Sequence, residues 1–402
     1  MIGRLLDRLN ALVAPPPAPP TRALVLSGGG ARSAYQAGAL QYIAETFPDA
    51  SFPIMTGASA GAINTAHLAN QTGPLADASA HLIESWTALR MKNVFRVESS
   101  LELLWGLVFP SSSPHPERPL TAEDVRSTHG LLDTSPLSDF LKEHLDAPDG
   151  VLTGIRENLK TDRLRAVAVV TTNYATGQTV TWVQGEDFDV WERPNRIGVH
   201  DQLTVDHIMA STAIPLVFPA VRIDDAWYGD GGIRLSAPLA PAVHLGADRI
   251  LVISNRYRQS RAEADAPVIH GYPPAAQIIG LLMNSVFTDA LEQDAHTLER
   301  VNRLVRELPP RRRKGMRPIR LLRLRPSVDL GRLADDYQGH IPTPIRYLTT
   351  GLGTGETLSP DWLSVLLFDP EYIDRLIDIG YHDARQRRDE IETFLADDPA
   401  ET

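Results

Sequence analysis

Three short glycine-rich stretches are the parts of this sequence best suited to chemistry. They read SGGGAR at 27–32, GASAG at 57–61 and GDGG at 229–232, and each follows a run that predicts a β-strand. Glycine lets a chain turn tightly after a strand and lets backbone N–H groups approach a ligand closely. The three stretches are therefore candidate functional loops.

The middle stretch places Ser59 between Gly57 and Gly61 in the spacing G-x-S-x-G. Between a strand and a helix, this spacing is typical of a nucleophile elbow, a sharp turn that presents the serine hydroxyl at the edge of a sheet. The alternative is that Ser59 only caps the start of the helix, a position that serine often takes. The pentapeptide alone leaves both interpretations open.

The first stretch offers the consecutive backbone N–H groups of Gly28, Gly29 and Gly30 beside a predicted helix N-terminus. Such donors suit an anion, either a bound phosphate or an oxyanion that forms during acyl transfer. The dinucleotide fingerprint G-x-G-x-x-G fits poorly because Ser33 stands at its third glycine, and no Gly-Lys-Ser/Thr follows to make a P-loop. We therefore expect an oxyanion hole.

The third stretch supplies a carboxylate, Asp230, between two glycines. A serine hydroxyl needs a base to become a nucleophile, and an aspartate within hydrogen-bond reach can accept its proton. The alternatives are a simple tight turn, or a triad completed by His244 or His270, neither of which lies in a glycine-bounded turn. Taken with the other two stretches, the sequence favours a Ser59–Asp230 pair without histidine.

The elements around these loops follow a strand–turn–helix rhythm. A buried strand is predicted at 23–27 and a helix at 32–45, and FPIMTG and AGAINTAHLANQ repeat the pattern. This rhythm indicates a mainly parallel sheet covered by helices. Further predictions are two strands joined by a turn in LRAVAVVTTNYATGQTVTW, a helix in QLTVDHIMASTAI, a two-stranded element in AVRIDDAWYGDGG, a buried strand at 248–254, a helix at 273–307, an edge strand at 318–326 and a helix at 370–397.

The blocks VLSGGGARSAYQAGAL, GASAGAIN and ASTAIPLVFPAV…WYGDGGIRLSAPL together resemble the bacterial branch of the patatin-like phospholipases, over roughly residues 22–255. The resemblance implies a three-layer α/β/α sandwich with a mainly parallel central sheet. It implies a catalytic dyad of Ser59 and Asp230, with an acyl-serine intermediate. It also implies an oxyanion hole formed by the glycines of the first block, with Arg32 at that block's basic position, and no metal or other cofactor.

The activity that this resemblance implies is hydrolysis of carboxylic esters in lipids, of the phospholipase A or lysophospholipase type, with a phospholipid or another acyl lipid as substrate. Two alternatives remain open at this point. One is an esterase or transacylase that acts on other acyl esters. The other is a lipid-binding scaffold that has the same shape and does not turn substrate over.

The composition limits the remaining function classes. The 402 residues carry a net charge of −11, which argues against nucleic-acid binding, and the absence of cysteine excludes disulfides and thiolate chemistry. No apolar run reaches the roughly 18 residues that a transmembrane helix needs. Charged residues interrupt the N-terminal apolar stretch, so no cleavable signal peptide is expected. We expect a cytoplasmic protein, with peripheral membrane contact as an open option.

The predicted organisation has three parts. Residues 1–20 form an amphipathic helix and a proline-rich linker, 21–258 form the catalytic domain, and 259–402 form a mostly helical extension packed on the core. Three segments are candidate membrane contacts, which are 1–13, 101–109 and the basic run 311–325. Each has a structural alternative. Residues 1–13 could instead dock on the protein's own surface, 101–109 could be a core helix, and 311–325 could be a solvated loop with an edge strand.

Overall fold

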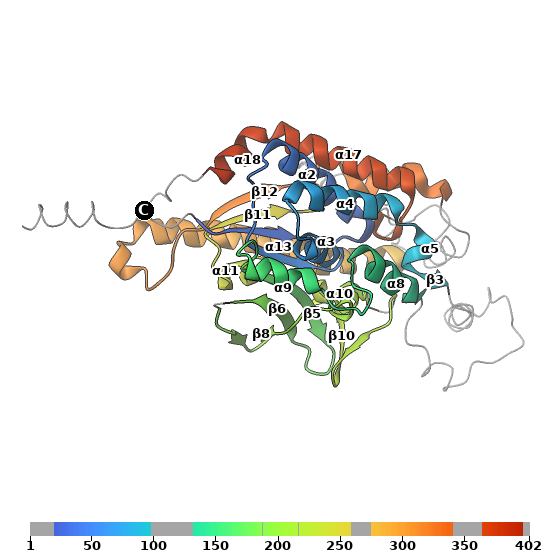
Figure 1. Cartoon of the computed structure of the whole chain (residues 1–402), viewed down its shortest axis with the longest axis horizontal. Coiled ribbons are helices and arrows are strands. Elements are labelled where there is room, and N and C mark those ends of the chain that lie inside the picture. The colour runs from blue at the N-terminus through green and yellow to red at the C-terminus, as the bar shows by residue number, and fades with distance from the viewer. Residues whose placement is uncertain are drawn as a thin grey trace, which may run out of the picture.

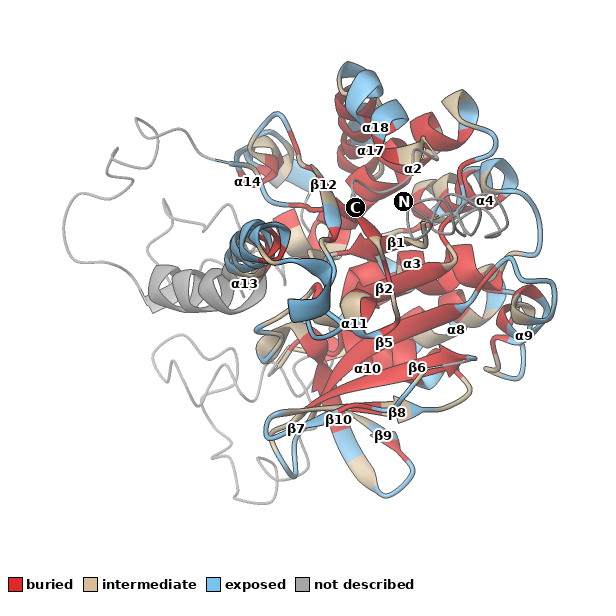
Figure 2. Ribbon diagram, turned by 90° about the vertical axis from the view of Figure 1, so that its left-hand side faces the viewer, coloured by how far each residue is buried: buried red, intermediate tan, exposed pale blue. Residues whose placement is uncertain are grey.

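The computed structural model describes six parts of the chain, which are 20–97, 132–186, 188–215, 217–258, 275–340 and 364–396. Together these parts form one ten-stranded sheet with helices on both of its faces, as Figure 1 and Figure 2 show. The predicted fold class, an α/β sandwich around a mostly parallel sheet, is confirmed.

The strands follow the order β12-β11-β1-β2-β5-β6-β8-β7, and β10 pairs with β5 and β9. The first five strands of this order run parallel to one another, whereas β6 runs antiparallel to β5. Their bounds are β1 Arg22–Leu26, β2 Ile54–Ala58, β5 Ala166–Asn173, β6 Thr179–Gly185, β7 Glu192–Arg193, β8 Arg196–His200, β9 Val221–Ile223, β10 Ala226–Asp230, β11 Arg249–Ile253 and β12 Arg320–Leu324. A separate two-stranded sheet joins β3 Arg96–Val97 and β4 Leu132–Asp133.

The helices divide between the two faces of the large sheet. The α helices are α2 Ala34–Thr46, α3 Ala60–Asn70, α4 Leu75–Ala88, α5 Met91–Val94, α8 Ser135–His144, α9 Thr153–Lys160, α10 Val205–Thr212, α11 Ala240–His244, α13 Ala275–Glu307, α14 Leu330–Leu333, α17 Pro370–Gln386 and α18 Arg388–Leu395. The 3₁₀ helices are η1 Gly30–Ser33, η3 Gly231–Ile233, η4 Pro310–Arg312 and η5 Ala334–His340. α11 and α13 cover one face, and most of the other α helices cover the opposite face (Figure 2).

Alternating side chains of the central strands build two separate cores. On β1, Leu24 and Leu26 point into the larger core, while Ala23 and Val25 point into the core beneath α11 and α13. Successive side chains of a strand point to opposite faces, and a sheet covered on both faces requires apolar residues at every position. The continuous apolar runs in the sequence are therefore explained by burial on both sides.

The C-terminal part of the chain is joined to the rest of the sheet through an edge strand and a helix. β12 pairs in parallel with β11 at the end of the sheet, as the alternation of 318–326 predicted. α17 packs along α2, where a Cβ atom on Gly380 would lie 1.9 Å from the Tyr35 carbonyl oxygen and one on Gly38 would lie 1.9 Å from that of Ile377. Two helices can approach this closely only where both lack side chains at the crossing.

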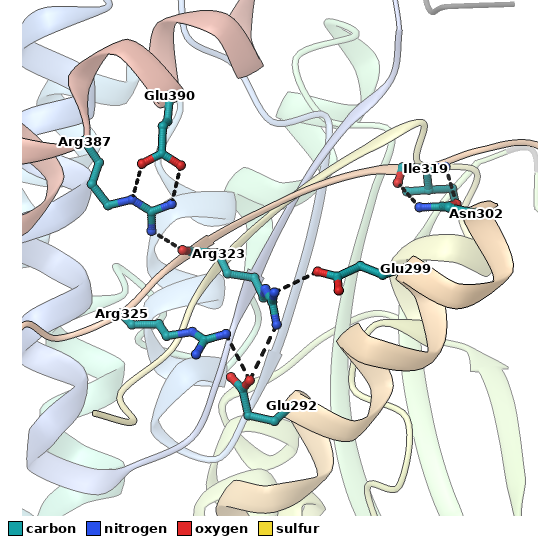
Figure 3. A network of polar contacts seen from close by, with 8 residues as sticks. All are labelled: Glu292, Glu299, Asn302, Ile319, Arg323, Arg325, Arg387 and Glu390. Carbon is teal, nitrogen blue, oxygen red and sulfur yellow. Dashed lines mark hydrogen bonds and ion pairs between the residues drawn. The ribbon is translucent and has the colours of Figure 1, made fainter. Parts of the chain in front are cut away.

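Charged side chains hold β12 against its neighbours (Figure 3). Glu292 on α13 accepts from Arg325 at 2.9 Å and from Arg323 at 3.5 Å, and Glu299 accepts from Arg323 at 2.7 Å. Arg387 donates to the carbonyl oxygen of Arg323. Arg387 is also where the predicted helix 370–397 divides into α17 and α18. The edge strand is thus tied to α13 by ion pairs and to the α17–α18 junction by a hydrogen bond from Arg387, and these contacts help to cover an otherwise open sheet edge.

Candidate active site

The ends of β2 and β10 meet beside β5 and thereby bring the predicted dyad together. β2 runs parallel to β5 and ends with Ala58 opposite Val170, whereas β10 runs antiparallel to β5 and ends with Asp230 opposite Thr171. Because β6 occupies the other side of β5 along this stretch, β2 and β10 share one side and point at each other. Ser59, the next residue after β2, therefore lies beside Asp230.

Ser59 occupies a strained backbone conformation at this junction. Its φ of 54° and ψ of −135° lie in a region that L-residues rarely adopt, at a cost of about 1–3 kcal/mol. The strain is held by Ser211 on α10, whose hydroxyl accepts from the Ser59 N–H at 3.0 Å and donates to the Val170 carbonyl oxygen at 2.7 Å. The Ser59 side chain makes no capping hydrogen bond to α3. The helix-cap alternative therefore does not account for this serine.

The two elbow glycines are required by close packing. A Cβ atom on Gly61 would lie 2.2 Å from the carbonyl oxygen of Leu26, and one on Gly57 would lie 2.4 Å from that of Gly61. Both contacts are far inside the distance that real Cβ atoms tolerate. Any side chain at either position would push α3 away from the strand ends and displace Ser59.

The glycine loop borders the Ser59 hydroxyl. A Cβ atom on Gly28 would lie 2.7 Å from the Ser59 Cβ and 3.4 Å from its Oγ, and Gly30 has a φ of +55°. No described residue accepts a hydrogen bond from the N–H groups of Gly28, Gly29 or Gly30. Asn255, just after β11, holds the loop through its Nδ2, which lies 3.1 Å from the Gly28 carbonyl oxygen. The loop is thus fixed beside the serine with donors to spare.

Asp230 is fully buried and its backbone is clamped. The Asp230 N–H donates to the Ala213 carbonyl oxygen at 2.9 Å, and the Thr172 hydroxyl donates to the Asp230 carbonyl oxygen at 2.9 Å. One carboxylate oxygen, Oδ1, accepts from the Gly232 N–H at 2.7 Å. This last bond is the kind of contact by which an aspartate stabilises a tight turn, the alternative role considered for Asp230. It occupies only one of the two carboxylate oxygens.

The Asp230 carboxylate also interacts with the Ser59 hydroxyl. Burial raises the pKa of Asp230 to about 7, and hydrogen bonding from the Ser59 hydroxyl opposes that rise more strongly than the Gly232 N–H does. Oδ2 is nevertheless buried without a partner of full hydrogen-bond geometry among the described residues. The serine contact is therefore longer or less aligned than a normal bond, as is common for catalytic pairs in the absence of substrate.

An apolar cavity opens directly from Ser59. Its walls come from α3, α4, α5, α8 and the segments around 212–218 and 364–368. Side chains such as Ile63, Phe140 and Phe218 line it, and nearly all of its lining is apolar. A cavity of this kind suits a hydrocarbon chain, with the reactive end placed at the serine.

The remaining predicted residues lie outside this arrangement. Arg32 is buried, and its Nε donates to the Ser364 hydroxyl at 2.6 Å, so its side chain joins the glycine loop to the C-terminal extension. His244 stacks on Trp191 at the end of α11, just before β11 begins. It therefore lies near the N-terminal ends of the parallel strands, whereas Ser59 lies at their C-terminal ends. His270 lies outside the described residues. The described chain thus offers no support for a triad through His244.

The membrane-contact segments have different outcomes. Residues 1–13 and 101–109 lie outside the described residues. In the run 311–325, Arg323 and Arg325 are paired with acidic residues, and Arg317 pairs with Asp248 at 2.5 Å. The exposed residues from 311 to 317 precede β12. They therefore lie toward the N-terminal ends of the parallel strands, away from the C-terminal ends where Ser59 lies. Membrane contact through this run stays a prediction.

The described part of the chain lacks two further features. None of its helices is both long enough and apolar enough to pass through a bilayer. Within the same residues, histidine and acidic side chains form no group of three that could hold a metal ion.

The sequence matches the model of the patatin-like phospholipase family over residues 24–243, which is more than half of the chain. No curated protein matches it significantly.

Similar solved structures include VipD from Legionella pneumophila, with 15% identity, a TM-score of 0.38, and coverage of 93% of this chain and 67% of VipD. Human GIVD cytosolic phospholipase A2 has 13% identity and a TM-score of 0.44, with 94% and 60% covered. ExoU from Pseudomonas aeruginosa has 14% identity and a TM-score of 0.33, with 92% and 54% covered. This chain thus spans between about half and two thirds of those proteins. The family model carries the assignment: the chain belongs to the patatin-like phospholipase family.

Proposed function

We propose that this protein is a serine hydrolase of lipid acyl esters, of the phospholipase A or lysophospholipase type. The observation that carries the proposal is the end-to-end meeting of β2 and β10, which sets Ser59 against the buried carboxylate of Asp230 at the mouth of an apolar cavity. The substrate's acyl chain would occupy that cavity, and its ester carbonyl would lie beside Ser59.

In the proposed first step, the Asp230 carboxylate takes the proton of the Ser59 hydroxyl while Oγ attacks the ester carbonyl carbon. The carbonyl oxygen becomes an oxyanion, and the free N–H groups of Gly28, Gly29 and Gly30 stabilise it. Collapse of the tetrahedral species expels the alcohol, which receives the proton from Asp230, and leaves an acyl-serine.

In the proposed second step, Asp230 takes a proton from water, and the resulting hydroxide attacks the acyl-serine. Ser59 leaves with that proton and the fatty acid is released. An ordinary aspartate is a weak base, and the raised pKa of Asp230 makes this one better matched to the task near neutral pH. The burial of Asp230 is a reason for one aspartate to replace the usual histidine.

The proposal is tested with a fluorophosphonate probe and with lipid digests analysed by mass spectrometry. Wild-type protein is expected to be labelled at Ser59 and to release fatty acid, and Ser59→Ala and Asp230→Asn are expected to lose release. The matched control is Asp225→Asn, because Asp225 lies fully exposed in the turn between β9 and β10. Full activity in either dyad variant would refute the dyad.

The same digest separates the alternatives. Turnover of short soluble esters with no release from phospholipid or lysophospholipid would favour an esterase. Transfer of the acyl group to an added alcohol in place of water would favour a transacylase. Lipid binding without labelling or release would favour a scaffold.

A further inference from the structure

One buried histidine interrupts the apolar wall of the cavity that opens from Ser59. His67 on α3 lines this cavity and is only 2% exposed. Its Nε2 has no hydrogen-bond partner among the described residues, while the ring as a whole also interacts with the backbone of Ala78. A buried polar atom without a hydrogen-bond partner destabilises the fold. Its presence in an otherwise apolar wall therefore suggests a ligand that supplies the missing hydrogen bond.

Three other polar side chains in the wall have partners. The Ser85 hydroxyl donates to the His81 carbonyl oxygen at 2.9 Å, the Trp86 Nε1 donates to Asn64 Oδ1 at 2.8 Å, and the Thr212 hydroxyl donates to a carbonyl oxygen within its own helix. Among the described residues that line the cavity, His67 is the one with a buried side-chain nitrogen or oxygen left unpaired.

His67 lies at a fixed depth from the serine. Ala60, Ile63 and His67 all line the cavity and follow the i, i+3, i+7 spacing of one helix face. With a rise of about 1.5 Å per residue, His67 lies about 12 Å along α3 from Ser59. A zigzag of carbon–carbon bonds of about 1.5 Å advances roughly 1.25 Å per bond, so the imidazole would face roughly the tenth carbon of an extended acyl chain.

His67 is uncharged at neutral pH. Burial, followed by the neighbouring His81, lowers the pKa of His67 to about 4. A neutral imidazole has one N–H donor and one bare nitrogen acceptor, and which nitrogen carries the proton depends on the tautomer. A hydroxyl group can both donate and accept, so it can pair with Nε2 in either tautomer. A keto oxygen or a double bond cannot.

We propose that His67 selects acyl chains that carry a hydroxyl group near the middle of the chain. The inference rests on the proposed lipid hydrolase activity and adds a substrate class to it. In a cavity without His67, such a hydroxyl would be buried without a partner, which disfavours the chain by roughly 5- to 150-fold. With His67, the hydroxylated chain keeps its hydrogen bond after leaving water.

The test is a competition between equimolar p-nitrophenyl esters of stearic acid, 10-hydroxystearic acid and 17-hydroxystearic acid, with the released acids measured by mass spectrometry. Wild-type protein is expected to favour the 10-hydroxy ester over both others. In His67→Phe, the ratio of kcat/KM for the 10-hydroxy ester to kcat/KM for the stearate ester is expected to fall roughly 5- to 150-fold. His67→Gln keeps a donor and an acceptor and should retain part of the preference.

The control is His144→Phe, because His144 lines the same cavity but its Nδ1 is already bonded to the Phe140 carbonyl oxygen at 3.0 Å. This variant should keep the preference. Equal hydrolysis of all three esters by wild-type protein, or loss of preference in His144→Phe alone, would overturn the role of His67 and leave the proposed hydrolase activity standing.

A binding measurement separates the two proposals. Displacement of a fluorescent fatty acid by free 10-hydroxystearic or stearic acid reports the cavity without turnover. Tighter binding of the hydroxy acid that disappears in His67→Phe would support the inference even if no ester is cleaved, in which case the hydrolase proposal alone would fail. Equal binding of both acids would count against the inference.

Discussion

Replacing Asp230 by asparagine should stabilise the fold at alkaline pH while it removes activity. The carboxyl of Asp230 is fully buried, and its pKa is raised from 3.8 to about 7, chiefly because burial disfavours the charged form. In the unfolded chain the same carboxyl ionises near its ordinary pKa. The native state therefore holds a proton that the unfolded state has lost between these two values, and stability falls as the pH rises through this window.

The size of the effect follows from the two pKa values. About three units at about 1.36 kcal/mol each give a penalty of about 4 kcal/mol once both states are ionised, above pH 7. At pH 5 the native carboxyl is still protonated and the unfolded one is mostly ionised, so the penalty is only about 2 kcal/mol. The stability gained by Asp230→Asn should thus be roughly 2–3 kcal/mol larger at pH 8 than at pH 5.

The assay is urea unfolding of wild-type protein and of Asp230→Asn at several pH values between 5 and 8. Any constant effect of the amide on packing cancels, because only the change with pH is compared. Asp225→Asn, which alters an exposed carboxylate, should show no such pH dependence. A stability difference that stays flat from pH 5 to pH 8 would refute the argument, since Asp230 would then be charged in the native state throughout.

Three further predictions concern the same site. The kcat/KM for ester hydrolysis should rise with pH and level off above about 7, because only ionised Asp230 accepts a proton; a profile already flat from pH 5 would contradict this. Ser211→Ala should cost about 1–3 kcal/mol in urea unfolding and lower kcat more than KM, because the Ser59 N–H loses its partner; unchanged kcat would show that the elbow holds itself. Gly61→Ala should abolish fluorophosphonate labelling and destabilise the fold by at least about 1–3 kcal/mol, since its Cβ would lie 2.2 Å from a backbone oxygen of β1. Gly339→Ala, which meets nothing within 4 Å, serves as its control.

Much of the sheet could be predicted from the sequence because its central strands are buried on both faces. Continuous apolar runs such as 248–254 predict strands of this kind, and glycine-rich turns fix where they end. The edge strand β12 was predictable from its alternation. The break between α17 and α18 at Arg387 was not, because no helix-breaking residue marks it and its contacts come from β12.

The residues that support the site were harder to find. Ser211 and Asn255 fix the elbow and the glycine loop through hydrogen bonds to backbone atoms far away in the sequence. A serine within a helix and an asparagine after a strand carry no local signal of such a role. His67 was likewise indistinguishable from an ordinary core histidine until the cavity around it was known.

The sequence by itself determined which side chains and turns are candidates for the site. Gly-x-Ser-x-Gly, the glycine triplet and Asp-Gly-Gly are local patterns, and the backbone geometry of each follows from its own residues. Only the tertiary structure decided that Ser59 and Asp230 face each other, because this depends on two strands of opposite direction that end side by side on β5. It also decided the raised pKa of Asp230, because burial is a property of the packed surroundings and not of the residue.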